Sequence, residues 1–251
     1  MSIDPKYLEK FITTTEKAAY GASLFLGKGD KIAADKGAVD LMRSELNKID
    51  MKGKIVIGEV EMYEAPMLYI GEKVGTKKGQ LLDIALDPLE GTNFVANNLP
   101  NAFSVIAIAE EGNLLAAPDT YMEKIAIGSG FTKNLLDLDN SVEQNINLLA
   151  NAKKVKPSEL TVCLLERTRH QKIIEELKKM NVKIKFIQDG DVSGVLCVTD
   201  KDSPVDMYIG TGGAPEGILA AAALSCFNAQ MQSRLVLDKE ESKRAVKLGI
   251  R

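Results

Sequence analysis

Histidine and cysteine are scarce in this chain, and their scarcity argues against two classes of site. The 251 residues include one histidine, His170, and three cysteines, Cys163, Cys197 and Cys226. The cysteines are odd in number, widely spaced and set among apolar neighbours. This pattern indicates small core residues in a reducing cytoplasm and not a disulfide framework. A zinc site built from histidine and cysteine is likewise not indicated.

The chain also lacks long apolar runs and any surplus of positive charge. The longest apolar stretch, residues 218–224, is far too short to cross a bilayer. The first residues include acids and resemble an amphipathic helix, so no export signal is indicated. The formal net charge is −3, with lysines interspersed among acids. We therefore expect a cytoplasmic protein that binds neither membranes nor nucleic acid.

The first half of the sequence combines helical periodicity with short strands that end in acids. With 45% hydrophobic and 27% charged residues, the chain can form one large core or two smaller ones. Apolar spacing predicts helices first and then short apolar strands, followed by a hairpin with a third strand. The predicted helices are 5–26 and 36–49, the strands 54–57 and 81–86, the hairpin strands 103–109 and 114–117, and the third strand 124–127.

The second half alternates between strand and helix patterns. A polar surface helix is expected over 140–154, and after it come β-α units. The strands are predicted at 160–165, 182–187 and around 206, and the helices at 170–180 and before 227. The chain is therefore predicted to be a mixed α/β (α+β) protein of two lobes, 1–139 and 140–251.

The segment Asp87-Pro88-Leu89-Glu90-Gly91-Thr92 has the strongest functional pattern. Loops at the carboxyl ends of strands are where open α/β sheets bind ligands. Pro88 can turn the chain so that Glu90 lies beside Asp87, and Gly91 allows close approach of a ligand to the backbone. Thr92 would supply a hydroxyl at the start of the next segment, a natural place for phosphate. Such carboxylate oxygens suit Mg²⁺ or Mn²⁺.

Each of these features also has a purely structural interpretation. Asp87 and Glu90 are common turn formers, although a second acidic group at Glu59, at the end of another strand, needs partners that metal ions would provide. Asp35 could be the N-cap of a helix. The glycine-rich segment 210–217 could be a tight strand-to-helix connection.

Five motifs in this order, GEVEMYEAPMLYIGEKVG, DPLEGT, APDTYMEK, DGDV and GTGGAPEG, strongly resemble class II fructose-1,6-bisphosphatase, a branch of the lithium-sensitive inositol-phosphatase-like superfamily. The resemblance covers residues 15–235. It implies a layered α-β-α-β-α sandwich and a cytoplasmic enzyme of gluconeogenesis and glycerol metabolism. It also implies two or more Mn²⁺ or Mg²⁺ ions per site and a homo-oligomer, either a dimer or a tetramer.

The resemblance assigns metal ligands and a reacting phosphate site. The ions would activate water against the 1-phosphate of fructose-1,6-bisphosphate. Asp87 is the candidate bridging ligand, and the assignment of Asp35 as a ligand replaces its interpretation as an N-cap. The implied metal ligands are Asp35, Glu59, Asp87, Glu90 and Glu216. The implied catalytic residues are Thr92, Asp35 and Glu59, and those at the reacting phosphate are Glu90, Gly91 and Thr92.

The other implied substrate contacts lie mostly in the second lobe. Arginine forks suit the distal phosphate, and the aspartates would accept hydrogen bonds from sugar hydroxyls. These contacts are Tyr121, Arg167, Thr168, Arg169, Asp189, Gly190, Asp191 and Gly213. The alternatives are solvated charges for the arginines, an exposed turn for residues 189–191 and a half-buried core residue for Tyr121. His170 is expected to be a bystander or a minor phosphate contact.

The sequence also departs from the family pattern. Val60 stands where a glycine is usual, and Tyr63 where an aspartate is usual. Family members continue beyond the position of Arg251, so the second lobe is expected to be incomplete. Two alternatives to fructose-1,6-bisphosphatase remain. One is hydrolysis of sedoheptulose-1,7-bisphosphate or an inositol phosphate, and the other is a non-catalytic sugar-phosphate-binding or assembly protein.

Overall fold

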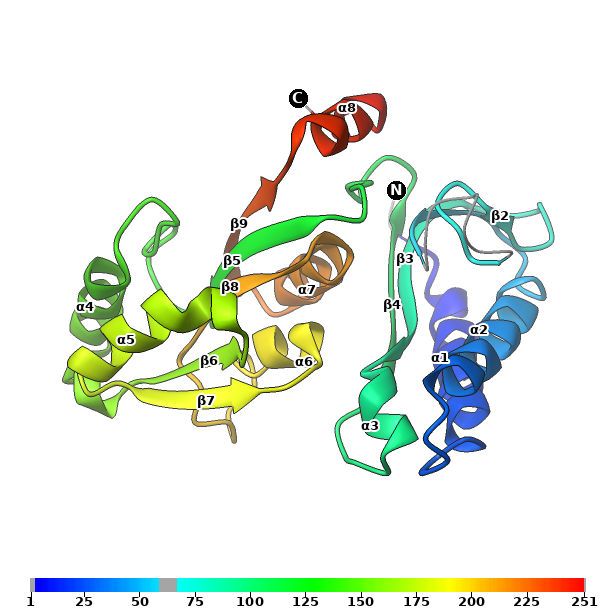
Figure 1. Cartoon of the computed structure of the whole chain (residues 1–251). Coiled ribbons are helices and arrows are strands. Elements are labelled where there is room, and N and C mark those ends of the chain that lie inside the picture. The colour runs from blue at the N-terminus through cyan, green and yellow to red at the C-terminus, as the bar shows by residue number, and fades with distance from the viewer. Residues whose placement is uncertain (1–2, 59–66, 251) are drawn as a thin grey trace. The chain divides into compact units, whose positions relative to one another are not determined.

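The computed structural model describes residues 3–58 and 67–250. These residues form two compact units (Figure 1), each with its own sheet. Unit 1 comprises residues 1–119 and 244–251, and unit 2 comprises residues 120–243. The change of unit therefore falls between Asp119 and Thr120, whereas the sequence prediction placed it after residue 139. The segment after Thr120 joins unit 2 because its strand pairs within the second sheet.

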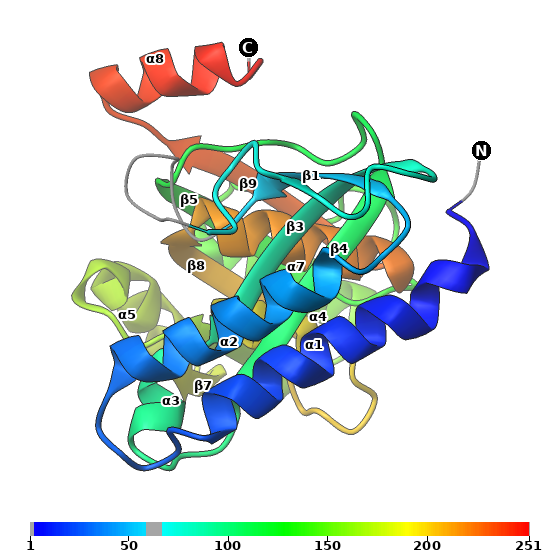
Figure 2. The ribbon, with the colours of Figure 1, turned by 90° about the vertical axis from the view of Figure 1, so that its right-hand side faces the viewer.

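Unit 1 is built on a four-stranded sheet in the order β2-β1-β3-β4. β1 and β3 are parallel neighbours, and β4 runs antiparallel to β3. The helices α1 and α2 lie side by side across β3 and β4 (Figure 2). The elements of this unit are η1 Pro5–Tyr7, α1 Leu8–Ser23, α2 Lys31–Leu46, β1 Lys52–Ile57, β2 Lys73–Val74, β3 Leu81–Glu90, α3 Thr92–Ala96 and β4 Phe103–Glu110.

The core of unit 1 lies between the helix pair and one face of the sheet. Ile84 and Leu86 point to this face from alternate positions of β3, as the period of two in a strand requires. Ala38 and Met42 meet them from α2, which carries buried residues at helical spacing. The apolar periodicity that predicted these helices therefore matches the faces that the structure buries.

Unit 2 contains a five-stranded sheet in the order β7-β6-β8-β5-β9. β6 is parallel to β7 and β8, whereas β5 is antiparallel to β8 and β9. Its elements are β5 Tyr121–Ile127, α4 Val142–Lys153, η2 Pro157–Glu159, β6 Thr161–Leu165, η3 Thr168–His170, α5 Gln171–Lys179, β7 Lys183–Ile187, α6 Asp191–Leu196, β8 Met207–Gly213, α7 Ala214–Cys226 and β9 Gln230–Val236. α8, Lys239–Lys247, crosses from the residues of unit 2 into those of unit 1.

Both faces of the second sheet are covered by helices. Ile125 and Val162 pack with α4 and α5 on one face. Ala126 and Cys163, their sequence neighbours, pack with α6 and α7 on the other. Strands that are buried on both faces appear as continuous apolar runs such as TVCLL. The mixed α/β class is confirmed, with one helical layer on the sheet of unit 1 and two on the sheet of unit 2.

Two predictions about element boundaries are wrong. α2 begins at Lys31 and not at residue 36, because the carboxylate of Asp30 accepts a hydrogen bond from the amide of Ala33 (2.9 Å) and forms the N-cap. Asp35 therefore lies inside the helix. β3 does not end at Leu86 but continues to pair with β4 as far as Glu90.

The predicted hairpin is also wrong. β4 pairs with β3, and residues 114–117 form no strand. The carboxylate of Asp83 accepts hydrogen bonds from the amides of Gly112 (2.7 Å) and Leu114 (3.4 Å), and these bonds fix the segment after β4 as a loop. Residues 124–127 do form a strand, but it belongs to β5 in the other sheet.

The cysteines differ from one another in exposure. Cys163 is buried, Cys197 is half-buried and Cys226 is exposed, and none of the three forms a disulfide. Their interpretation as core residues is therefore right for Cys163 but wrong for Cys226, which ends the last turn of α7. Burial raises the pKa of the Cys163 thiol to about 12. Among the helices described, none has the length and apolarity needed to span a membrane.

Candidate active site

In unit 1, the carboxyl end of β1 lies beside its parallel neighbour β3, shortly before the second acidic motif. Ile57, the last residue of β1, pairs with Ala85 of β3, and Asp87 follows two residues later. The two strands predicted before the acidic motifs are therefore neighbours in one sheet, although Asp87 and Glu90 lie within β3 and not after it. The predicted ligand Glu59 lies outside the described residues, so its place in the site stays a prediction.

A bulge in β3 positions the second motif. Asp87 pairs with Val105 and Glu90 with Phe103, so Pro88 and Leu89 stand opposite the single residue between them on β4. Proline suits a bulge because it has no amide hydrogen for the ladder. The carboxylate of Asp87 accepts a hydrogen bond from the amide of Leu89 (3.0 Å). The bulge therefore adds one residue between two carboxylates, of which Asp87 is half-buried and Glu90 buried.

Gly91 and Thr92 follow the bulge directly. Gly91 has a φ of 85°, a left-handed conformation that glycine adopts without the strain imposed by a side chain. Thr92, half-buried, is the first residue of the short helix α3. The chain thus turns sharply after Glu90, and the hydroxyl of Thr92 lies close in sequence to both carboxylates.

Asp35 comes from α2 but belongs to the same end of unit 1. The amides of Gly27 and Gly29, just before α2, donate to the carbonyls of Val95 and Ala96 in α3, each at 2.9 Å. These bonds hold the start of α2 against the helix that follows the bulge. Asp35 is half-buried in the second turn of α2. The structure therefore brings Asp35, Asp87 and Glu90 to one end of unit 1.

The donor atoms at this end fit a hard divalent cation. All three side chains are carboxylates, which supply the oxygen ligands that Mg²⁺ and Mn²⁺ prefer. Within residues 3–58 and 67–250, however, no three carboxylate, imidazole or thiol groups lie close enough to form a metal-binding group. Convergence of all five predicted ligands thus stays a prediction, since Glu59 is not described and Glu216 belongs to unit 2.

In unit 2, the predicted substrate residues follow the carboxyl ends of the parallel strands β6, β7 and β8. Residues 167–169 come after β6, residues 189–191 after β7, and Gly213 ends β8 shortly before Glu216. Parallel strands place these ends on one edge of the sheet, where open α/β sheets bind ligands. Tyr121 begins β5, which is antiparallel, and pairs with Gly213.

β6 pairs with β8 only at Met207 and Tyr208. Further along β8, two side chains bond the main-chain groups of Thr211 instead. The amide of Thr211 donates to Nε2 of His170 (2.8 Å), and Nε of Arg169 donates to the carbonyl of Thr211 (2.9 Å). The guanidinium of Arg169 also lies over the ring of Tyr121, with its Cζ 4.9 Å from the ring centroid. Because Thr211 occupies Nε, the two Nη groups are those that can bind a phosphate.

Arg167 has a different environment. Its Nη1 and Nη2 donate to the carbonyls of Glu166 (3.0 Å) and Gln188 (2.6 Å), which ties the end of β6 to the end of β7. Neither Arg167 nor Arg169 is simply a solvated charge, although both are exposed. Thr168 is exposed between them. Of the two arginines, Arg169 has the guanidinium with more donors to offer to an anion.

His170 is buried, and both of its ring nitrogens are engaged. Nδ1 lies 2.7 Å from the carbonyl of Leu165, and Nε2 accepts from the amide of Thr211. This arrangement requires a neutral ring with its hydrogen on Nδ1. Burial lowers the pKa of His170, and the adjacent Arg169 lowers it further, so the neutral form is favoured. The geometry thus agrees with the expectation of a bystander and gives it a structural role.

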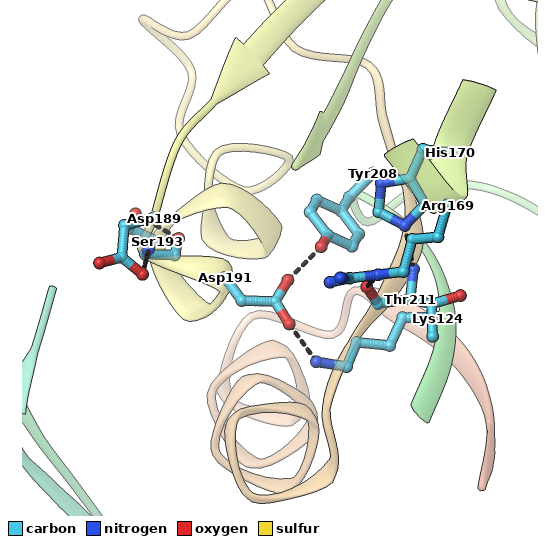
Figure 3. Close-up of polar contacts among 9 residues, drawn as sticks. Lys124, Arg169, His170, Asp189, Asp191, Ser193, Tyr208 and Thr211 are labelled. Carbon is cyan, nitrogen blue, oxygen red and sulfur yellow. Dashed lines mark hydrogen bonds and ion pairs between the residues drawn. The ribbon is translucent and has the colours of Figure 1, made fainter. Parts of the chain in front are cut away.

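The turn at residues 189–191 contains two aspartates in different environments (Figure 3). Asp191 is 6% exposed, and its carboxylate accepts hydrogen bonds from the ammonium of Lys124 and the hydroxyl of Tyr208. The alternative of an exposed turn is therefore wrong for Asp191. Asp189 is half-buried, and its carboxylate accepts from the amide of Gly190 (3.1 Å). Neither Lys124 nor Tyr208 was predicted from the sequence to be a site residue.

The glycines around β8 are explained by the side chains packed against them. A Cβ on Gly212 would lie 2.1 Å from Oδ2 of Asp191, and a Cβ on Gly213 would lie 1.9 Å from Oε2 of Glu216. The glycine-rich segment therefore lets the carboxylates of Asp191 and Glu216 lie against the main chain, a closer approach than a simple turn requires. Tyr121, 53% exposed, is not the half-buried core residue that the alternative interpretation proposed.

Comparison with known proteins assigns the chain to a family. The family model described as "Bacterial fructose-1,6-bisphosphatase, glpX-encoded" matches residues 6–251. The chain belongs to this family. The resemblance inferred from the five sequence motifs is thereby confirmed, and with it the class of enzyme, a phosphatase.

Similar curated proteins bear the same family name. The class 2 fructose-1,6-bisphosphatase of Haemophilus influenzae is 44% identical over 241 residues, which cover 94% of this chain and 72% of that protein. Fructose-1,6-bisphosphatase 1 class 2 of Escherichia coli K12 is also 44% identical, with coverages of 94% and 71%. A Synechococcus relative at 40% identity, with coverages of 95% and 72%, is named D-fructose 1,6-bisphosphatase class 2/sedoheptulose 1,7-bisphosphatase.

The solved structures that match this chain are more distant. The extragenic suppressor protein suhB of Bartonella henselae has a TM-score of 0.42 and 13% identity, with coverage of 78% of this chain and 74% of that chain. An IMPase of Thermotoga maritima has a TM-score of 0.42 and 14% identity, with coverages of 77% and 73%.

Proposed function

We propose that this chain hydrolyses the 1-phosphate of fructose-1,6-bisphosphate and releases fructose-6-phosphate and phosphate. The observation that carries this proposal is the 44% identity, over 94% of the chain, to proteins named for that activity. The grouping of Asp35, Asp87 and Glu90 at one end of unit 1 supports it. The grouping of Arg169, Asp189 and Gly213 at one sheet edge of unit 2 supports it further.

Unit 1 would bind the cations and the reacting phosphate. Asp35, Asp87 and Glu90 would hold divalent ions, as would Glu59 by its sequence motif, and Mn²⁺ or Mg²⁺ fits this oxygen donor set. When bound, two or more such ions supply the positive charge that acidifies water and neutralises phosphoryl oxygens. The hydroxyl of Thr92 would orient the attacking water in line with the leaving oxygen.

Unit 2 would bind the sugar and the distal phosphate. The Nη groups of Arg169 can donate two parallel hydrogen bonds to phosphate oxygens. Tyr121 holds that guanidinium from one side through the contact at 4.9 Å. Asp189 would accept hydrogen bonds from sugar hydroxyls. Arg167, with two of its nitrogens bonded to main-chain carbonyls, would position the adjacent turn.

The test is a phosphate-release assay on this chain with fructose-1,6-bisphosphate, with and without added Mn²⁺ or Mg²⁺. We expect metal-dependent release that stops at one phosphate per sugar. Asp87→Asn should lower kcat by about a thousandfold, because the loss of one charged ligand disrupts the cation site. Asp40→Asn, an exposed change on α2, is the matched control and should keep full activity. Undiminished activity in Asp87→Asn would contradict the proposed site.

A second candidate substrate is sedoheptulose-1,7-bisphosphate. The Synechococcus relative whose name includes this activity is 40% identical over 95% of the chain. Both sugars carry a phosphate at each end, so an arginine at the distal phosphate fits either one. Comparing kcat/KM for the two bisphosphates with that for inositol monophosphate separates the alternatives. Calorimetric binding of the sugar bisphosphate without any phosphate release would instead favour the non-catalytic alternative.

We further propose that the protein works in the cytoplasm as a homo-oligomer. Support for the compartment comes from the unpaired cysteines, and support for the assembly comes from the family resemblance. Light scattering on the purified protein tests the assembly and would show a mass above 27.3 kDa. A monomeric mass at working concentration would contradict it.

A further inference from the structure

The side chains of Lys124, Asp191 and Tyr208 form a buried charged network in unit 2 (Figure 3). Lys124 is 1% exposed and Tyr208 is 0% exposed. The ammonium of Lys124 contacts Oδ2 of Asp191, and the hydroxyl of Tyr208 donates to Oδ1. The members come from β5, β8 and the start of α6, so the network joins three elements that are distant in sequence.

A buried ammonium is costly unless a carboxylate neutralises it, and each partner therefore requires the other. Tyr208 also stabilises the carboxylate of Asp191 through its hydrogen bond. Burial and the adjacent Asp191 raise the pKa of the Tyr208 hydroxyl well above its usual value, so that the hydroxyl keeps its proton. The hydroxyl is therefore always a donor at working pH. With one donor on each oxygen, the carboxylate of Asp191 is fixed in its orientation.

The network lies directly against the glycine-rich main chain of β8. A Cβ on Gly212 would be 2.1 Å from Oδ2 of Asp191 and 3.2 Å from Nζ of Lys124. The neighbouring Thr211 is held from its other side by Arg169 and His170. The position of Asp191 therefore sets how the turn at residues 189–191 sits beside Thr211 and Gly213.

The two aspartates of this turn divide into an internal and an outward-facing one. Asp191 is buried with both oxygens bonded, whereas Asp189 is half-buried. Gly190 lies between them with a φ of 79°, a left-handed conformation that favours glycine. The turn therefore changes direction at Gly190, so that its two carboxylates can serve different purposes.

We propose that Lys124 and Tyr208 are positioning residues that hold Asp191 as an internal anchor and thereby place Asp189 to contact the sugar bisphosphate. This inference rests on the proposed function of the chain. It assigns a role to Lys124 in the APDTYMEK motif and to Tyr208. It also replaces the role of Asp191 as a direct acceptor of sugar hydrogen bonds.

The first test is the variant Tyr208→Phe, which removes one hydroxyl and keeps the ring. We expect the KM for fructose-1,6-bisphosphate to rise severalfold with kcat nearly unchanged, because the turn loses its fixed position and the reacting phosphate keeps its ligands. The matched control is Lys153→Met, which removes another lysine–aspartate pair of unit 2, that with Asp206. The control should lower Tm without changing KM. A Tyr208→Phe protein that behaves like this control overturns the inference.

The second test is a double-mutant cycle between Lys124→Met and Asp191→Asn. If Lys124 acts on substrate binding through Asp191, the double variant should have about the same KM as the single variants, since each one disrupts the same pair. If Lys124 affected substrate binding independently of Asp191, the two increases in KM should multiply, and the inference fails. Asp189→Asn should raise KM on the order of tenfold with Tm unchanged.

The wild-type assay separates the two levels of proposal. A wild-type chain that releases no phosphate in the presence of Mn²⁺ overturns the proposed function, and the inference falls with it. The inference alone is overturned if the wild-type chain is active while Tyr208→Phe, Lys124→Met and Asp191→Asn all keep the wild-type KM. If Lys124→Met fails to fold, Tyr208→Phe and Asp189→Asn still decide between the outcomes.

Discussion

His170 makes the stability of unit 2 depend on pH. Burial lowers its pKa below the ordinary value of 6.5. Between the folded-state pKa and pH 6.5, the unfolded chain therefore binds more protons than the folded chain does. The free energy of unfolding should therefore be highest above pH 6.5 and fall as pH decreases through the folded-state pKa. The loss cannot exceed about 1.4 kcal/mol for each unit by which the pKa is lowered. Urea unfolding at pH 7.5 and 5.5 measures it.

The variant His170→Gln is the control for this prediction. Glutamine does not titrate, so the difference between the two pH values should shrink relative to the wild type. Because the imidazole accepts from the amide of Thr211 at 2.8 Å, the variant should also be less stable at pH 7.5. An equal pH dependence in both proteins would rule out His170 as its source.

Substitution by alanine should affect different properties at the adjacent glycines Gly212 and Gly213, stability at the first and activity at the second. In Gly212→Ala the new Cβ meets the buried pair of Asp191 and Lys124, and we expect a loss of about 1–3 kcal/mol in the free energy of unfolding. In Gly213→Ala it meets the end of the half-buried side chain of Glu216, which can rotate away. That variant should keep its stability and lose activity.

Denaturant titration and the phosphate-release assay on both proteins check this contrast. Each variant adds the same methyl group at neighbouring positions, so each serves as the control for the other. Equal losses of stability in the two proteins would mean that the buried pair does not determine the cost.

Among elements, the contact between α1 and α2 depends on two glycines. A Cβ on Gly21 would lie 2.1 Å from the carbonyl oxygen of Gly37, and a Cβ on Gly37 would lie 2.7 Å from that of Gly21. Gly21→Ala should therefore push the helices apart and cost about 1–3 kcal/mol, an effect that outweighs the gain of about 1 kcal/mol in helix propensity. Chemical denaturation measures the change. The exposed change Ser23→Ala, expected to stay within about 0.5 kcal/mol, is its control.

Short-range patterns explain which elements could be predicted from sequence. Apolar runs such as TVCLL are buried on both faces, and this predicts a strand directly. The start of α2 was missed because Asp30 and Asp35 are equally plausible caps until the bond to Ala33 is known. The strand β9 was not predicted, nor was the pairing of residues 124–127 with β8 and β9. Pairing between strands that are distant in sequence leaves little local signal.

The candidate site shows the same limit. Carboxylates at strand ends and a glycine-rich turn were visible as motifs. Lys124 was not, because the segment MEKIAI has the alternation of an ordinary strand. Only the contact with Asp191, 67 residues away, shows that the lysine is buried and paired. Long-range electrostatic pairing of this kind leaves no periodic trace in a single sequence.

For the whole molecule, the division into units has a consequence for folding. Unit 2 is one continuous segment, residues 120–243, with apolar clusters on both faces of its own sheet. A unit with its own core can fold alone. We therefore expect the isolated segment Thr120–Lys243 to unfold cooperatively in urea and to show mixed α/β circular dichroism.

The same fragment separates folding from catalysis. It retains Arg169, Asp189 and the Lys124 network but lacks Asp35, Asp87 and Glu90, and it should therefore release no phosphate at any concentration of Mn²⁺. Within the fragment, Lys124→Met should lower stability by about 3–5 kcal/mol, because it leaves the buried carboxylate of Asp191 without its cation. A fragment that folds but loses nothing on this substitution would contradict the pairing, and a fragment without a cooperative transition would contradict the independence of unit 2.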